Sequence, residues 1–389
     1  MTELRSTLVD RAIALQPLLR EHTAKADLDR RLTDEVDTAL VEAGFFRLFT
    51  PKRFGGFEAD VSTVLEVSEA LAEADASAGW AVGVGSVANW MVGQFAERAR
   101  QEVFGATASP RIVGSNAAVA ARRVDGGLRL SGRWSFASGS DRAQWVTLGS
   151  AVVDESGQIV GAAMSLVPVS ELTPEHTWLT VGMRATASDT WVADDLFVPQ
   201  HRVLPIDALI AGEHPFPVEE AMYQRPAAPL ANALLLGAIL GAGREALRLV
   251  VAKAPTKPMH HTFFARQSDS VGAQIQIAEA AMKLKTARLH AFDVAETLDN
   301  ATTGTDEVPY ARRAEIRAQL SHAAQESLAA INTLVNVHGA GTFAETNRLQ
   351  QLWRDANTAA RHAALNPYVG YEVHGKDLLG IAERVSPMV

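Results

Sequence analysis

The sequence contains no cysteine among its 389 residues. Disulfides, thiolate nucleophiles, iron–sulfur clusters and thiolate zinc sites are therefore all excluded. Basic residues are also in deficit, since 36 Lys and Arg face 45 Asp and Glu and the formal net charge is −9. This charge excludes the broad positive surface that nucleic-acid binding needs, although it allows a local cationic pocket.

Long apolar runs are scarce as well. Two stretches, residues 76–96 and 226–243, carry no charge, but both include several glycines and polar residues. A membrane-spanning helix needs about 20 predominantly apolar residues, so we predict buried core helices and no membrane partner. Charges interrupt the first 20 residues and no apolar segment of a signal peptide is found there. We therefore predict a cytoplasmic protein.

The residues that are present fall into three zones, which predict domains at 1–110, 111–210 and 211–389. The first zone has apolar residues at helical spacing and predicts a helical lobe. The second alternates apolar and polar residues between turn signals, which predicts a small β-barrel or sandwich. Its clearest strands are 128–134, 146–153 and 192–198.

The third zone returns to helical periodicity and predicts an antiparallel four-helix bundle joined by short loops. The four periodic runs are 230–251, 263–298, 310–338 and 344–365, and 299–308 is a polar connection. The predicted fold class is thus α+β and mostly α, with a β domain inserted between two helical lobes.

Several motifs in this arrangement resemble the acyl-CoA dehydrogenase superfamily. They are residues 132–139 (GRWSFASG), residues 182–189 (GMRATASD) and the following FVP at 197–199. Two further motifs, residues 349–355 (LQQLWRD) and 361–367 (RHAALNP), resemble its flavin-dependent monooxygenase branch. The resemblance covers about residues 25–385 and implies the oxygenase component of a two-component system.

The resemblance implies a reaction and partners. A flavin reductase would supply FADH2 or FMNH2, which reacts with O2 at its C4a carbon. The resulting hydroperoxide would then transfer oxygen to a small aromatic substrate. The pocket has to exclude water, because the adduct otherwise collapses to hydrogen peroxide. The family is tetrameric, so a homotetramer is also implied.

The resemblance places the flavin in the groove between the β domain and the bundle. There Trp134 and Phe136 would wall the ring, and Ala137 and Ser138 would serve its polar edge. From alternation alone, the two aromatic residues are equally ordinary strand residues that face the core.

The phosphate end of the flavin needs cationic side chains or backbone N–H groups that approach it closely. The resemblance assigns Arg266, at the start of the second bundle helix, to the flavin phosphate of a neighbouring subunit. His338 and Gly339 match the family's glycine-rich turn. Arg266 as a solvated surface residue and Gly339 as a helix cap stay open as alternatives.

The position nine residues after Arg354 separates the two branches of the superfamily. Acyl-CoA dehydrogenases often place a glutamate base there, whereas this chain has Ala363 next to His362. Histidine can donate to a peroxide or deprotonate a substrate, so His362 is the predicted catalytic residue, with Ser115 as a second. Helix packing for His362 and a turn role for Ser115 stay open, as does a structural Arg354–Asp355 ion pair.

The residues expected to contact the substrate differ from those of the phenol hydroxylases. Those carry a histidine eight residues after a tryptophan that matches Trp80, where this chain has Ala88. An electron-rich ring such as indole, or oxidation at N or S, is therefore favoured over simple phenols. The predicted substrate contacts are Trp80, Asn89, Trp90 and Trp191, with core packing as the alternative for the tryptophans.

Other readings of the sequence stay open. The function alternatives are an acyl-CoA dehydrogenase with bound FAD, or a non-catalytic or flavin-free relative of the fold. No metal site is predicted, because the histidines lack ligand partners at useful spacing.

Overall fold

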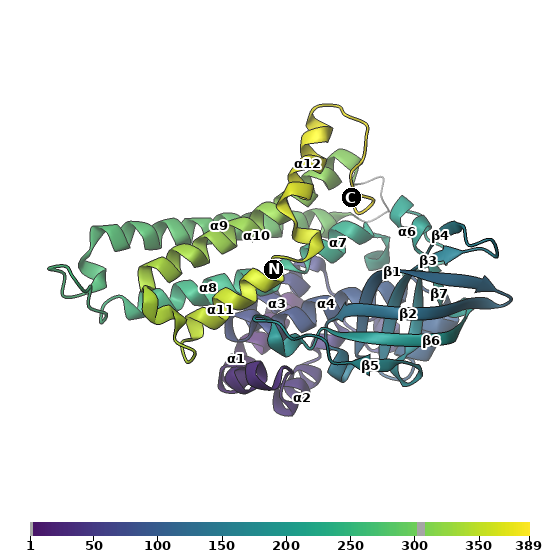
Figure 1. Cartoon of the computed structure of the whole chain (residues 1–389), viewed down its shortest axis with the longest axis horizontal. Coiled ribbons are helices and arrows are strands. Elements are labelled where there is room, and N and C mark those ends of the chain that lie inside the picture. The colour runs from purple at the N-terminus through teal and green to yellow at the C-terminus, as the bar shows by residue number, and fades with distance from the viewer. Residues whose placement is uncertain (1–2, 302–307) are drawn as a thin grey trace.

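The computed structural model describes residues 3–301 and 308–389. A helical lobe packs on one side of a long helix bundle, and a β-sheet lies at one end of that bundle (Figure 1). The predicted fold class, mostly helical with a central β region, is confirmed. The change from helix to strand falls between Phe104 and Ile112, and the last strand ends at Pro205.

The N-terminal lobe is built from five helices. They are α1 (Glu3–Asp29), α2 (Asp34–Glu42), α3 (Val61–Ala74), α4 (Ala76–Gly93) and α5 (Glu97–Phe104). The carboxylate of Asp75 caps α4 by accepting hydrogen bonds from the backbone N–H groups of Ser77 and Ala78. This cap satisfies two donors at the helix start and fixes where the uncharged helix α4 begins.

The strands form one seven-stranded sheet in the order β5-β6-β2-β1-β3-β4-β7. Their bounds are β1 (Ile112–Val124), β2 (Gly127–Ala137), β3 (Trp145–Val153), β4 (Ile159–Pro168), β5 (Thr173–Glu175), β6 (Asp189–Pro199) and β7 (Val203–Pro205). Strands β2 and β6 pair antiparallel with Trp134 opposite Trp191. The register then shifts before Ala137, which places one extra residue on β2, as in a β-bulge.

The C-terminal region contains the bundle and additional helices. They are α6 (Ile206–Ala211), α7 (Ala227–Ala233), α8 (Leu236–Lys253), α9 (Val271–Asn300), α10 (Tyr310–His338), α11 (Arg348–Ala359) and α12 (Pro367–Leu378). Helices α8 to α11 run side by side (Figure 1). Of the predicted connection 299–308, residues 302–307 lie outside the described residues.

Two predicted helix bounds in the bundle are wrong. The run 263–298 becomes helical only at Val271, because Ser270 caps the helix and Phe263 is fully solvent-exposed. The run 344–365 is α11 alone, which ends at Ala359, and the prediction missed α12. Pro367 starts that extra helix at a position where its missing N–H breaks no helical hydrogen bond.

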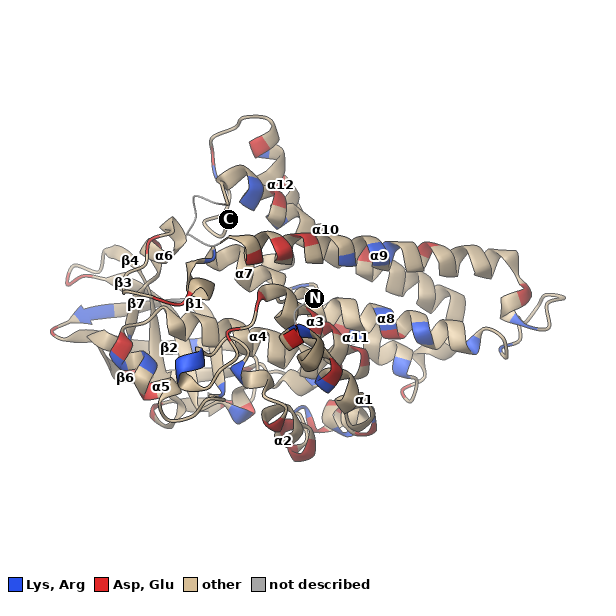
Figure 2. Cartoon of the chain, turned by 180° about the vertical axis from the view of Figure 1, so that it is seen from behind, with Lys and Arg blue, Asp and Glu red and all other residues tan. Residues whose placement is uncertain are grey.

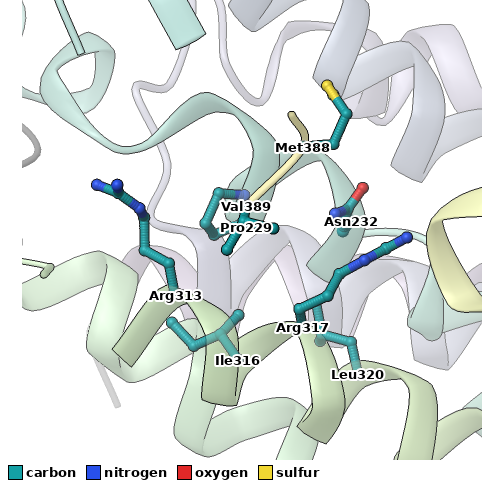
Figure 3. A pocket seen from close by; sticks show the side chains of 8 residues that line it. All are labelled: Pro229, Asn232, Arg313, Ile316, Arg317, Leu320, Met388 and Val389. Atoms are coloured by element: carbon teal, nitrogen blue, oxygen red, sulfur yellow. The ribbon is translucent and has the colours of Figure 1, made fainter. Parts of the chain in front are cut away.

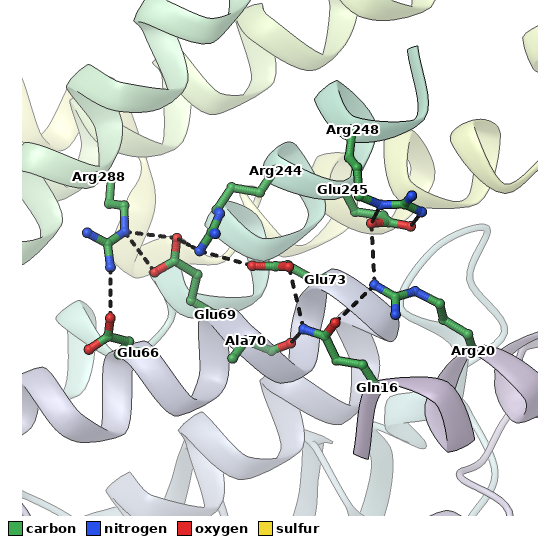
Figure 4. Close-up of polar contacts among 10 residues, drawn as sticks. All are labelled: Gln16, Arg20, Glu66, Glu69, Ala70, Glu73, Arg244, Glu245, Arg248 and Arg288. Carbon is green, nitrogen blue, oxygen red and sulfur yellow. Dashed lines mark hydrogen bonds and ion pairs between the residues drawn. The ribbon is translucent and has the colours of Figure 1, made fainter. Parts of the chain in front are cut away.

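A buried ion-pair network joins the N-terminal lobe to the bundle (Figure 4). Glu69 of α3 is buried and pairs with Arg244 of α8 and Arg288 of α9, at 3.3 and 3.0 Å. Burial raises the pKa of Glu69, against the effect of the two arginines. The α3 and α8 backbones also come close, since a Cβ on Gly241 would lie 2.3 Å from the Glu69 carbonyl oxygen. Close packing and paired charges therefore hold the two lobes in register.

Charges elsewhere are mixed rather than gathered by sign. Figure 2 shows acidic and basic residues interspersed along α1, α9 and α10. Within the described residues, no helix is both long and apolar enough to span a membrane.

Candidate active site

The geometry brings three of the predicted site residues together. The ring of His362 lies edge-on to the indole of Trp80, with ring centroids 5.9 Å apart. The indole N–H of Trp80 donates to the hydroxyl of Ser138 at 3.0 Å. Residues from α4, from the end of β2 and from the turn after α11 therefore meet at one place.

His362 occupies the turn because α11 stops three residues earlier, at Ala359. Its Nδ1 accepts a hydrogen bond from the backbone N–H of Ala364 at 3.2 Å, so the neutral ring carries its proton on Nε2. The His362 residue as a whole is solvent-exposed. Enough protein surrounds the ring that desolvation, helped by the charge of Arg317, lowers the pKa of His362. At neutral pH the imidazole is thus an uncharged donor through Nε2.

Ser138 is the first of three hydrogen-bonded hydroxyl groups that all donate in the same direction. Its oxygen lies 2.7 Å from that of Ser188, which lies 2.7 Å from that of Thr186. Thr186 donates its only hydroxyl proton to the Met183 carbonyl, and Trp80 can only donate. Ser138 therefore donates to Ser188 and Ser188 to Thr186, which leaves Ser138 one lone pair free as an acceptor.

Phe136 presents an aromatic face beside this group. The bulge in β2 gives Phe136 a φ of +66°, and its side chain is 73% exposed. Its ring stands perpendicular to that of Trp178, with centroids 6.1 Å apart. A bulge aims a side chain out of the sheet, so Phe136 can serve as a platform for a planar ligand.

The loop that carries Trp178 is fastened to α11. Asp355 is buried and accepts a hydrogen bond from the Met183 backbone N–H at 2.6 Å. A Cβ on Gly182 would lie 2.2 Å from the Arg354 carbonyl oxygen, so only glycine permits this approach. Arg354 pairs with Asp27 at 3.2 Å instead of Asp355, which contradicts the ion pair that the sequence left open.

Three predicted aromatic contacts are contradicted by burial. Trp134 has no exposed surface and donates its indole N–H to the Gly149 carbonyl at 2.8 Å, so it offers no face to a flavin. Trp191 is 4% exposed and lies in the same β-sheet core. Trp90 is 1% exposed and donates to the Met222 carbonyl. These tryptophans are core residues.

Two predicted polar contacts are also contradicted. Asn89 is 1% exposed, and its amide donates to the Phe46 carbonyl at 2.7 Å. It lies nine residues after Trp80, on the opposite side of α4. Ser115 is buried and donates its hydroxyl proton to the Ser135 carbonyl at 2.5 Å. Ser115 therefore positions the strand that leads into Phe136, and the geometry contradicts a direct catalytic role.

The remaining predicted flavin contacts lie far from this place. Arg266 is in the loop before α9 and pairs with Asp269 at 3.0 Å. Nδ1 of His338 lies 3.2 Å from Nζ of Lys257. Desolvation is the main cause that lowers the pKa of His338, and the charge of Lys257 lowers it further. Gly339 caps the end of α10 with a φ of +77°. The loops that carry these residues lie at the end of the bundle opposite the sheet (Figure 1). Ala137, by contrast, lies beside Ser138 but is fully buried, so only its backbone can serve a ligand.

Sequence reasoning missed several residues of the site. Ser188 and Thr186 belong to the quoted motif 182–189, and their hydroxyl groups were the available signal. Trp178 and Arg317 carried no recognisable signal, because neither lies in a motif. Within the described residues, no three His, Asp or Glu side chains gather as a metal site would require.

This fold and site define a flavoprotein with the acyl-CoA dehydrogenase architecture. Residues 10–108 match the family "Acyl-CoA dehydrogenase, N-terminal domain", and residues 233–367 match "Acyl-CoA dehydrogenase, C-terminal domain". The chain is 31% identical over 377 residues to the flavin-dependent monooxygenase oxygenase subunit HsaA of Rhodococcus jostii, covering 96% of this chain and 98% of the relative.

Two further relatives agree. An FADH2-dependent resorcinol hydroxylase oxygenase component of Rhizobium sp. is 30% identical over 390 residues, covering 96% and 94% of the two chains. The structure of XiaF from Streptomyces sp., in complex with FADH2 and glycerol, matches with a TM-score of 0.92 at 36% identity, covering 100% and 97%. The chain therefore belongs to the oxygenase components of two-component flavin-dependent monooxygenases, which use reduced flavin and O2.

The residues present fit a reduced flavin. A planar apolar ring requires an exposed face, which Phe136 supplies, and a polar edge requires partners, which the free lone pair of Ser138 and the donor of His362 supply. The catalytic glutamate of the dehydrogenase branch has no counterpart at Ala363.

Proposed function

We propose that this chain oxygenates an electron-rich aromatic or heteroaromatic substrate, indole-like in character or oxidised at N or S. A separate flavin reductase would supply the reduced flavin. The observation that carries the proposal is the meeting of His362, Trp80 and Ser138 beside the exposed Phe136. Reduced flavin, when bound, supplies the electrons that activate O2.

His362 supports the choice of substrate class. With its Nδ1 occupied by the Ala364 N–H, Nε2 carries the proton and donates a hydrogen bond. It is then poorly placed to remove a phenol proton, and Ala88 offers no second base on α4. A ring that is already nucleophilic needs no such base. The named resorcinol hydroxylase relative makes phenols the competing class.

The surface of α4 next to Trp80 supports an apolar substrate. Val84, Val87 and Met91 follow Trp80 at helical spacing and are half-buried. Such a wall suits an aromatic ring, because apolar area buried on binding contributes about 25 cal/mol per Å². For the cofactor we propose FADH2 over FMNH2, supported by the names of the relatives that are at least 30% identical.

Anaerobic titration tests the cofactor. We expect FADH2 to bind more tightly than FMNH2, and the Phe136→Ala variant to bind FADH2 about tenfold more weakly, because an aromatic platform is lost. Phe197→Ala, at another partly exposed aromatic position of the sheet, is the matched control and should bind normally. Supplied with reduced flavin and O2, the wild-type chain should hydroxylate indole faster than resorcinol. Failure of the wild-type chain to bind either reduced flavin would overturn the proposal.

A homotetramer, or at least a homo-oligomer, is proposed for a separate reason. Arg266, His338 and Gly339 cannot reach the Phe136 region of their own chain, so a second copy would have to supply the phosphate contacts. Helix α9 also exposes Ile275, Met282 and Leu289 at seven-residue spacing, at 53, 60 and 63% exposure. A stripe of this kind needs an apolar partner.

Sedimentation velocity tests this assembly. We expect Met282→Lys to reduce the oligomer mass, because a charge would be buried in the contact. Ile159→Lys, an exposed apolar residue on the sheet, is the control and should leave the mass unchanged. A wild-type protein that sediments as a monomer would contradict the proposal.

A further inference from the structure

Arg317 of α10 is a buried cation that lacks a counterion in the described part of the chain. It is 5% exposed, and one guanidinium nitrogen donates to the Ala363 carbonyl at 3.0 Å. Its Nε and its other terminal nitrogen have no hydrogen-bond partner. Burial lowers the pKa of Arg317, and no carboxylate among residues 3–301 and 308–389 offsets it. A buried charge is normally paired, so this arginine is equipped for an anion.

Arg317 also lines a small hollow (Figure 3). Asn232 of α7 lines the same hollow, is 6% exposed, and makes no side-chain hydrogen bond within the described residues. Ile316 and Leu320 supply apolar wall, and the terminal residues close the other side. The guanidinium of Arg313 points away from Arg317 in the same view. The hollow thus combines a cation, a neutral amide and apolar surface.

Arg317 connects this hollow with the turn that carries His362. The acceptor of Arg317 is the carbonyl of Ala363, the residue that follows His362. The positive charge of Arg317 is also one of the two causes that lower the pKa of His362. An anion held by Arg317 would therefore lie near the turn that carries His362.

We propose that Arg317 and Asn232 form a subsite for the carboxylate of an aromatic acid substrate. Guanidinium and carboxylate match in shape and form two parallel hydrogen bonds, and two nitrogens of Arg317 are free. The amide of Asn232 adds a donor. Met388 and Val389 have to move aside for the carboxylate to enter, because they line the hollow in this structure. The proposal rests on the proposed function for the identity of the aromatic part.

Binding without turnover separates this proposal from the proposed function. Calorimetric titration of the purified full chain, with neither flavin nor reductase, compares indole-3-acetate with its neutral isostere indole-3-acetamide. We expect wild-type protein to prefer the acid by about 10- to 100-fold, the range of one charge-assisted pair. Arg317→Gln should remove this preference while binding of the amide stays the same. If the preference is present while reduced flavin fails to bind, only the proposed function falls.

Controls make the outcome specific. Arg313→Gln removes the arginine one turn away and should leave the preference intact. If Arg317→Gln does not fold, Asn232→Ala should still lower the preference severalfold. Deletion of Met388 and Val389 should strengthen binding of the acid, and weaker binding would count against the proposal. Equal wild-type affinities for acid and amide would overturn it. So would an Arg317→Gln variant that weakens both ligands equally, which would assign Arg317 a structural role.

Discussion

Replacing His362 by alanine is expected to uncouple oxygen consumption from product formation. The variant should bind and oxidise reduced flavin normally, yet release most of the oxygen as hydrogen peroxide. The reason is the loss of the Nε2 donor beside Trp80, since removal of one such donor typically lowers the rate about 10²- to 10³-fold. Product per NADH or per flavin oxidised, measured with a peroxide assay, reports the coupling.

A second substitution separates chemistry from folding. The side-chain oxygen of His362→Asn can still accept the Ala364 N–H, so the turn and the melting temperature should be retained while coupling is lost. Arg361→Ala, at the exposed neighbouring position, is the control and should stay coupled. Normal coupling in both His362 variants would remove this residue from the mechanism.

The same geometry predicts the pH dependence of coupling. Desolvation and Arg317 lower the pKa of His362, so the ring is neutral through neutral and alkaline pH. Protonation at low pH would place a proton on Nδ1 and break the hydrogen bond from Ala364. Coupling should therefore be constant around neutrality and fall on acidification, below the ordinary histidine range.

Replacing Asp355 by asparagine is expected to stabilise the protein at pH 8 and to have a smaller stabilising effect at pH 5. Burial, opposed by the Met183 N–H and by Arg348, raises the pKa of Asp355 to about 7 from an ordinary 3.8. The folded state thus binds a proton more tightly than the unfolded state does. The free energy of unfolding falls as pH rises from about 4 to 7, because the buried carboxyl must then ionise.

The variant removes that dependence while keeping an acceptor for the Met183 N–H. The gain at pH 8 should be a few kcal/mol at most, since each pKa unit corresponds to about 1.4 kcal/mol. Thermal unfolding at both pH values measures it. Asp10→Asn, at an exposed position on α1, is the control and should change neither value. A loss of stability at pH 8 would show that the carboxylate is ionised and favourable there.

The sequence predicts the class of each zone because period and turn residues are local properties. It fails where tertiary contacts decide. Alternation puts Trp134 and Phe136 on one face of β2, but the bulge turns Phe136 outward and leaves Trp134 in the core. Helical period likewise continues past Ala359, whereas the chain turns there and the ring of His362 comes to rest against α4. Arg317 shows the same limit, since nothing in its neighbours reveals that it is buried without a carboxylate.

The fixed direction of the hydroxyl chain has a consequence for proton transfer. A Grotthuss wire works only if every link can hand its hydrogen forward, yet the chain from Trp80 ends on a backbone carbonyl that accepts and cannot pass anything on. The chain of Ser138, Ser188 and Thr186 therefore cannot relay a proton beyond the Met183 carbonyl.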